Sequence, residues 1–146
     1  MKRRNFIKTC CYSVVGGVLI PSGLQSCGTI HYAAVTLKDG DLILSKSEFW
    51  EMRNGKKVNR SFVIIQESTE EFPICINKIE EDKYIASLMK CTHRGCELNV
   101  GGGIYSCPCH GSEFSISGKV LEGPADIDLK SYEIKTDNEN IYLLNV

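Results

Sequence analysis

The chain has 146 residues, of which 42% are hydrophobic and 24% charged, and its formal net charge is −1. This length and composition are typical of one globular domain and exclude an intrinsically disordered chain. The sequence contains no internal repeat and no low-complexity tract.

Residues 1–26 are predicted to be an export signal. A basic start is followed by an apolar run from Cys10 to Ile20 and then by Pro21. That run is well short of the roughly 20 residues that a membrane-spanning helix needs. The segment 3–8, which reads R-R-N-F-I-K, resembles the twin-arginine motif R-R-x-F-L-K, an address for the export of folded proteins. A plain secretory signal and an uncleaved anchor are the alternatives.

The segment 24–27 reads L-Q-S-C and resembles a bacterial lipobox, in which cleavage precedes a cysteine that is then lipidated. The alternative is an ordinary cysteine at the end of a signal. Lipid on Cys27 would anchor the protein to a membrane surface. We then expect residues 27–31 to form a tether and residues 32–146 to form the domain.

Removal of residues 1–26 changes the charge balance of the chain. The signal holds four basic and no acidic residues, so 13 basic residues remain against 18 acidic ones, a net charge near −5. An acidic surface disfavours nucleic acid and suits a basic patch on a protein partner.

The chain then reads as short strands separated by turns. Asp39-Gly40 is a strong hairpin signal, and Asn54-Gly55 marks a second turn. Cys75 lies in an apolar run, so we expect a buried, unreactive thiol. His31 has no neighbouring ligand residue and is interpreted as an ordinary surface or strand histidine. Strands are expected at 32–37, 42–44, 48–52, 60–66, 72–79 and 84–89.

Two cysteine- and histidine-containing segments follow and indicate a metal site. Residues 91–96 read C-T-H-R-G-C, and residues 107–112 read C-P-C-H-G-S. Each segment pairs a cysteine with a histidine: Cys91 with His93, and Cys107 with His110. Thiolate and imidazole ligands suit zinc or an iron–sulfur cluster with mixed ligation. In the first segment the histidine follows the cysteine by only two positions, unlike the usual zinc-finger intervals.

Both segments resemble the motifs of Rieske iron–sulfur proteins, C-T-H-x-G-C and C-P-C-H-G-S. The resemblance extends more loosely over residues 30–146. It implies a 2Fe–2S cluster in which two cysteines bind one iron and two histidines the other. The residues implied as ligands are Cys91, Cys107, His93 and His110.

The resemblance also implies roles for residues around the cluster. Cys96 and Cys109 are the disulfide pair of this family, which requires an oxidising compartment. The Ser112 hydroxyl is expected to donate to a cluster sulfide and so raise the reduction potential. High-potential members have a tyrosine where this chain has Phe114, so one hydrogen bond is missing.

After the second motif the chain returns to strands. A hairpin around the glycines at 101–103 is expected between the motifs, and strands at 113–116, 132–135 and 141–144 follow. Gly123-Pro124-Ala125 matches the loop that covers the cluster in Rieske proteins, with Asp126 in place of a frequent second proline. The expected fold is all-β: a Rieske-like antiparallel β sandwich with an inserted small cluster-binding subdomain.

The expected function is one-electron transfer between a donor and an acceptor redox protein, such as a cytochrome or an oxidoreductase subunit. The expected location is the outer face of a bacterial cell membrane, where a lipid anchor holds the chain. A Rieske oxygenase needs a second iron held by two histidines and a carboxylate, but only His31 lies outside the motifs, so the chain alone is not an enzyme.

The alternative function is that of the iron–sulfur subunit of a larger oxidoreductase, such as a quinol–cytochrome c oxidoreductase or an arsenite oxidase. Arg94 stands where quinol-oxidising relatives usually have leucine, which counts against quinol without excluding it. Arg94 is interpreted either as a solvated loop charge or as a docking residue.

Overall fold

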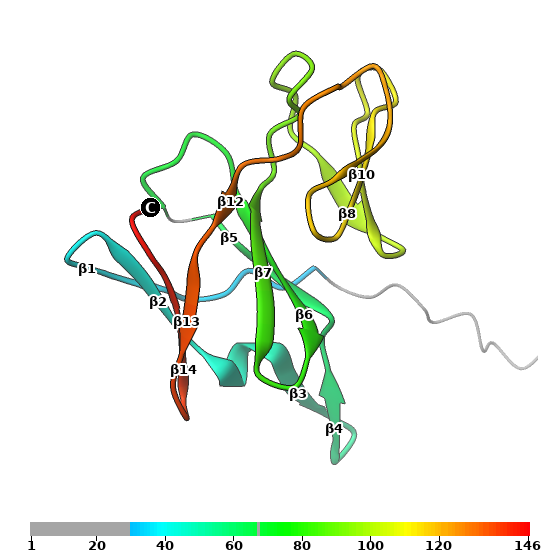
Figure 1. Cartoon of the computed structure of the whole chain (residues 1–146). Helices are drawn as coiled ribbons and strands as arrows, with labels where there is room; N and C mark the ends of the chain where they lie inside the picture. The colour runs from blue at the N-terminus through cyan, green and yellow to red at the C-terminus, as the bar shows by residue number, and fades with distance from the viewer. Residues whose placement is uncertain (1–29, 67) are drawn as a thin grey trace, which may run out of the picture.

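The structure is a computed structural model that describes residues 30–66 and 68–146. In this part of the chain the regular elements are β-strands and one short 3₁₀ helix, so the predicted all-β fold is confirmed (Figure 1). The described residues include no helix with the length and apolar character to span a membrane. The predicted export signal and the lipidated Cys27 lie outside the described residues.

Two four-stranded antiparallel sheets form the base of the molecule. The first sheet has the order β12-β7-β6-β5 and the second the order β1-β2-β14-β13. The first consists of β5 (Phe62–Ile65), β6 (Ile74–Glu80), β7 (Lys83–Leu88) and β12 (Ser131–Tyr132). The second consists of β1 (Thr36–Lys38), β2 (Asp41–Ser45), β13 (Ile134–Thr136) and β14 (Asn140–Leu143).

The main core lies between these two sheets. Leu42 and Leu44 alternate with more exposed neighbours along β2, as the two-residue period of a strand requires. The β5 sequence F-V-I-I is instead apolar throughout, because its sheet is covered on both faces. Val63 and Ile65 belong to the main core, whereas Ile64 belongs to a second core on the other face.

That second core connects the first sheet to a third sheet, which forms a separate lobe (Figure 1). The third sheet has the order β11-β10-β9-β8. Its strands are β8 (Asn99–Gly101), β9 (Ile104–Ser106), β10 (Glu113–Ser115) and β11 (Val120–Glu122). This lobe contains the second cysteine–histidine motif and corresponds to the predicted inserted subdomain.

Several stretches differ from the predicted strands. Of the predicted strand 32–37, only Thr36 and Leu37 lie in a strand, β1, and Tyr32 forms an isolated bridge with Ile64. Strand β11 was not predicted. The stretch 48–52, expected to be one strand, begins in the 3₁₀ helix η1 (Lys46–Phe49), where Ser45 Oγ accepts a hydrogen bond from the Ser47 amide at 3.2 Å. It continues as β3 (Trp50–Arg53), which pairs with β4 (Lys56–Asn59). Strand β4 was not predicted because all its residues are exposed and its sequence K-K-V-N has no apolar pattern.

The predicted strand 132–135 is divided between two sheets. Tyr132 pairs with Ala86 in the first sheet, whereas Ile134 pairs with Leu143 in the second. The change occurs at Glu133, whose carbonyl oxygen accepts a hydrogen bond from the Leu144 amide at 3.0 Å. The chain therefore crosses the edge of the sandwich here and closes the main core.

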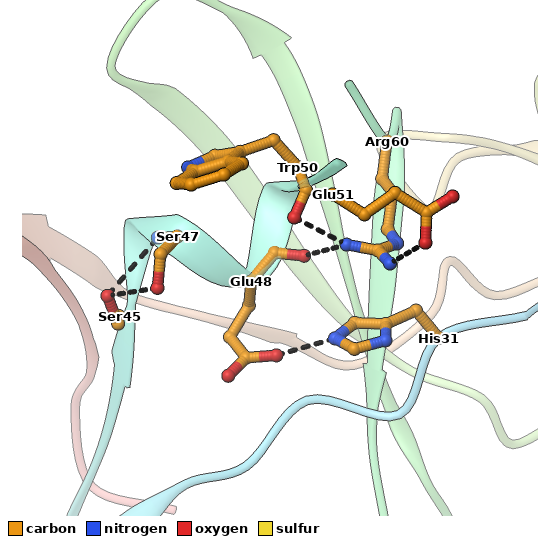
Figure 2. Close-up of polar contacts among 7 residues, drawn as sticks. All are labelled: His31, Ser45, Ser47, Glu48, Trp50, Glu51 and Arg60. Carbon is orange, nitrogen blue, oxygen red and sulfur yellow. Dashed lines mark hydrogen bonds and ion pairs between the residues drawn. The ribbon is translucent and has the colours of Figure 1, made fainter. Parts of the chain in front are cut away.

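The start of the described chain packs against η1 (Figure 2). His31 Nε2 lies 2.5 Å from Glu48 Oε2, and the His31 carbonyl oxygen accepts a hydrogen bond from the Ile64 amide at 2.9 Å. Arg60 donates to the carbonyl oxygens of Glu48 and Trp50 at 3.0 and 2.8 Å. His31 thus has a structural role: it fixes the point at which the chain enters the base.

Candidate metal centre

The two motifs fold into loops with the same backbone hydrogen bonds. In the first loop the Cys91 amide donates to the Cys96 carbonyl, and the Gly95 amide donates to the Cys91 carbonyl, each at 2.8 Å. In the second loop the Cys107 amide donates to the Ser112 carbonyl at 2.8 Å, and the Gly111 amide donates to the Cys107 carbonyl at 3.0 Å. Both glycines have positive φ (76° and 81°), which this tight turn requires. Cys91 and Cys107 therefore occupy equivalent positions in paired loops.

The thiols of these two cysteines are buried and lie side by side. Cys91 is 2% exposed and Cys107 is 4% exposed, and neither forms a disulfide. Burial alone raises the pKa of Cys107, but hydrogen bonds from the Cys109 and His110 amides and from the Cys91 thiol outweigh it and lower the pKa. A lower pKa raises the thiolate fraction of Cys107, and the thiolate is the form that binds metals.

The rings of the two motif histidines lie next to each other. The ring centroids of His93 and His110 are 4.9 Å apart, and the rings are nearly perpendicular. His110 is exposed, and His93 is partly exposed. The Nδ1 atom of His93 is buried and has no hydrogen-bond partner among the described residues. A buried polar atom without a partner carries an energetic cost, which a metal bound at this nitrogen would remove.

A disulfide between Cys96 and Cys109 joins the two loops, as the resemblance implied. Cys107 lies close to it, since the sulfur atoms of these three cysteines are within 4.8 Å of one another. That trio is not a ligand set, because the disulfide engages two of its sulfurs. The disulfide instead holds the two loops together beside the two thiols.

A third loop, residues 123–129, is fastened to both motifs by hydrogen bonds. The Ala125 amide donates to Ser112 Oγ at 3.0 Å, and Thr92 Oγ1 donates to the Ile127 carbonyl oxygen at 2.6 Å. Ser112 is fully buried and accepts in this bond, which leaves its own hydroxyl proton for another acceptor. The predicted covering loop at Gly123-Pro124-Ala125 therefore lies against the site. The role of Thr92 was missed, because a threonine gives no local signal for a partner 35 residues away.

Buried polar groups connect the third sheet to the base below the site. Asn77 Nδ2 on β6 donates to Tyr105 Oη on β9 at 2.7 Å, and Cys75 Sγ lies 3.7 Å from the same amide nitrogen. Burial raises the pKa of Cys75 to about 12, so this thiol is unreactive, as predicted. Phe114 on β10 is fully buried in the same core.

The donor set fits an iron–sulfur cluster with mixed ligation. The thiols of Cys91 and Cys107 are buried and free, the rings of His93 and His110 lie together, and His93 Nδ1 has no hydrogen-bond partner among the described residues. The disulfide uses the other two motif cysteines, so four protein ligands remain in the motifs. Thiolate and imidazole together suit iron or zinc, and the comparison with known proteins distinguishes the two.

A family model described as the Rieske [2Fe-2S] domain matches residues 42–133. The cytochrome b6-f complex iron-sulfur subunit of Synechococcus sp. (strain RCC307) is 40% identical over 55 residues, which are 36% of this chain and 31% of that protein. The corresponding subunit of Prochlorococcus marinus (strain MIT 9303) is also 40% identical over 55 residues, 36% of this chain and 31% of that protein. The matched segments thus span about a third of these relatives.

Among solved structures, similarity is found to the plasma membrane Rieske protein of Synechocystis PCC 6803. The sequences are 35% identical, the match covers 55% of this chain and 84% of that chain, and the TM-score is 0.49.

Proposed function

The chain belongs to the Rieske [2Fe-2S] domain family and is an iron–sulfur electron-transfer domain; we propose that it acts as a membrane-anchored carrier of single electrons. The cofactor is a 2Fe–2S cluster, which when bound supplies one-electron redox chemistry. The described residues hold no second set of histidines and carboxylates for an oxygenase iron, because His31 is engaged with Glu48 in the base.

We assign the cluster ligands to the two motif loops, with Cys91 and Cys107 on one iron and His93 and His110 on the other. The observation that carries this assignment is the buried, unpartnered Nδ1 atom of His93 beside the His110 ring. The adjacent buried thiols of the two cysteines support it. Neutral imidazoles leave the cluster less negative than four thiolates do, so the protein favours a higher potential.

The surrounding residues have roles that follow from their contacts. The Cys96–Cys109 disulfide keeps the loops paired, and Ser112 joins the second loop to the covering loop through Ala125. The Ser112 hydroxyl proton, unused in that bond, is available to a cluster sulfide. Such a hydrogen bond stabilises the reduced state and raises the potential.

We place the protein on the outer face of a bacterial membrane, with residues 1–26 as a twin-arginine signal, Cys27 as the lipid attachment site and residues 27–31 as the tether. The motifs at residues 3–8 and 24–27 support this location. The disulfide is compatible with it, because such bonds persist in oxidising compartments.

A second candidate function is that of a subunit in a larger oxidoreductase. The observation that favours it is the similarity to subunits of cytochrome b6-f complexes. The donor and acceptor would then be other subunits of that complex. Arg94 is exposed in this chain, which counts against an apolar quinol pocket at this position.

Cofactor analysis of the purified protein tests the ligand assignment. We expect two irons and two acid-labile sulfides per chain, and loss of both when Cys91, His93, Cys107 or His110 is replaced by alanine. Cys75→Ala is the matched control: it removes the third free thiol of the described residues, which is buried beside Asn77 outside the motifs, and should retain the cluster. A colourless protein with one zinc would refute the assignment.

Cell fractionation tests the location separately. Replacing Arg3 and Arg4 by lysine should leave the protein in the cytoplasm, and Cys27→Ala should release it from the membrane fraction. Membrane retention of Cys27→Ala through a carbonate wash would show that an uncleaved segment, not lipid, holds the chain.

A further inference from the structure

An open groove lies beside His93 on the surface of the site. Its volume is about 690 Å³, and the first motif loop, from Cys91 to Gly95, forms one of its walls. The apolar part is formed by Phe72, Leu88 and Ile127. Ile127, on the covering loop, is 64% exposed, so a large apolar side chain is presented to solvent next to a proposed cluster ligand. Exposed apolar surface of this kind marks interaction sites.

Three cations line the same groove: Lys90, Arg94 and Lys130. Lys130 pairs with Glu70, and Lys90 Nζ lies 3.4 Å from Glu71, whose side chain is 78% exposed. Arg94 forms no ion pair within residues 30–66 and 68–146. The three cations are therefore offset by two carboxylates, and the groove keeps a net positive charge.

The lysines of the groove are held in place by aromatic rings and by the first loop. Lys90 Nζ lies 4.9 Å from the Phe72 ring centroid, and Lys130 Nζ lies 4.9 Å from that of Tyr132. The Cε atom of Lys90 also lies 3.3 Å from the position that a Cβ at Gly95 would take. The two lysines, together with the exposed Arg94, therefore form a charged rim around the apolar surface, as the polar rim of a protein interface does.

This local charge opposes the charge of the chain as a whole. Residues 27–146 contain 13 basic and 18 acidic residues, yet the groove beside His93 is lined by three basic residues and by Glu71 alone of the acidic ones. Net charge therefore suggests a basic partner, whereas the surface nearest the proposed ligand suggests an acidic one. The local surface decides docking, because charges beyond about 10 Å are largely screened at 0.1 M salt.

We propose that this groove is the docking surface for an acidic redox protein, one whose carboxylates surround its own redox centre. The carboxylates would pair with Arg94 and the two lysines, and an apolar patch would cover Ile127 and Phe72. The groove would hold the partner beside the proposed ligand His93, so that the cluster and the partner could exchange one electron with no bond formed or broken. This proposal rests on the proposed function, and it names the chemistry of the redox partner.

Electron transfer to small reagents of opposite charge tests the local potential. We would reduce the holoprotein and measure its oxidation by ferricyanide, an anion, and by tris(phenanthroline)cobalt(III), a cation, at several ionic strengths. Ferricyanide and the groove carry opposite charges, so the rate of oxidation by ferricyanide should fall as the salt concentration rises. Arg94→Gln should slow ferricyanide about 3- to 10-fold at low salt and should not slow the cobalt complex.

Arg53→Gln is the matched control. Arg53 lies on the β3–β4 hairpin, at the opposite end of the molecule from the third sheet (Figure 1). Arg53→Gln removes the same charge from the chain as Arg94→Gln does, so an effect of net charge alone would appear equally in both variants. Equal effects of the two variants, or a rate with ferricyanide that rises with salt, would overturn the proposal.

Binding is measured independently of electron transfer. Carbodiimide joins carboxylates to lysines, so the holoprotein would be cross-linked to an acidic and to a basic cytochrome c and the products mapped by mass spectrometry. We expect cross-links from Lys90 and Lys130 to the acidic cytochrome, reduced at least 5-fold in Arg94→Gln and unchanged in Arg53→Gln. A preference for the basic cytochrome, or cross-links elsewhere, would refute the docking surface.

The two proposals fail in different ways. A protein without a cluster would show no oxidation by either reagent, which refutes the proposed function, while the cross-links would still report on the groove. A quinone that shifts the spectrum of the reduced cluster, with no cross-link to the acidic cytochrome, would assign the groove to a small molecule and refute the docking proposal.

Discussion

The hydrogen bond between Asn77 and Tyr105 connects the base to the lobe that contains the second motif, and Tyr105→Phe tests its contribution. The two groups are 4% and 0% exposed, and Asn77 Nδ2 lies 2.7 Å from Tyr105 Oη. Without the hydroxyl, the amide keeps only the Cys75 sulfur at 3.7 Å, and a thiol is a weak acceptor. A buried donor left unsatisfied costs about 1–3 kcal/mol, so we expect a loss of about 2 kcal/mol.

This loss should be visible as a lower melting temperature. A change of 1 kcal/mol shifts Tm by about 4–8 °C in domains of 60–100 residues and by about 2–4 °C in domains of 150–250 residues, so about 2 kcal/mol corresponds to roughly 6–10 °C here. The holoprotein variants would be melted at one scan rate and followed by circular dichroism, so that their Tm values are compared under identical conditions. Tyr32→Phe is the matched control, since Tyr32 is 56% exposed.

A double variant distinguishes the unsatisfied amide from a general packing defect. Asn77→Leu combined with Tyr105→Phe removes both polar groups, so it should be less destabilised than the sum of the single changes by about 1 kcal/mol or more. Equal melting temperatures for Tyr105→Phe and Tyr32→Phe, or strictly additive losses in the double variant, would refute the argument.

Three further predictions concern the residues around the cluster. Ser112→Ala should lower the potential in a redox titration by a few tens of millivolts, because a hydrogen bond worth about 1 kcal/mol corresponds to about 40 mV for one electron; an unchanged potential would contradict its role. Thr92→Val removes the hydrogen bond to the Ile127 carbonyl oxygen. The cluster absorbance should therefore decay faster, whereas the melting temperature of the base, measured by circular dichroism, should not change. Phe114→Tyr should raise the potential by a similar few tens of millivolts if the new hydroxyl reaches a cluster ligand, and the value should stay within the range of about −150 to +300 mV that Rieske centres span. If a structure of the variant shows the hydroxyl in contact with a cluster ligand and the potential is unchanged, the hydrogen bond does not tune the potential.

The hairpins of this fold could be predicted from the sequence because their signals are local. Asp39 and Gly40 both adopt positive φ, 54° and 89°, as the two-residue turn predicted at these positions requires. The turn at residues 80–83 likewise joins β6 to β7, and glycines 102 and 103 separate β8 from β9. In each case the turn residues and the flanking apolar residues lie within about ten positions of one another.

The motifs of the site were equally local, and the roles of their cysteines and histidines as cluster ligands came from the resemblance to a family and stay a prediction. Six-residue segments with a cysteine at the first position and a glycine at the fifth fold into the same loop, so the thiols of Cys91 and Cys107 became neighbours once the loops were paired. The disulfide partner of Cys109 came from the resemblance to a family and not from spacing, since eight cysteines allow many pairings.

Other features depend on contacts between residues far apart in the sequence. The exposed strand β4 has no apolar pattern and exists because β3 lies beside it, and the change of sheet at Glu133 follows from two partners that no local pattern identifies. Lys90 and Lys130 lie 40 positions apart, and tertiary contacts place both beside His93: the Leu88 amide donates to the Lys130 carbonyl oxygen at 2.9 Å, and Thr92 binds the covering loop. The sequence therefore determined the chemistry that the chain carries, because ligands and turns are encoded in short segments. The tertiary structure alone decided which surface faces a partner, because the charge of a surface is set by residues that folding brings together.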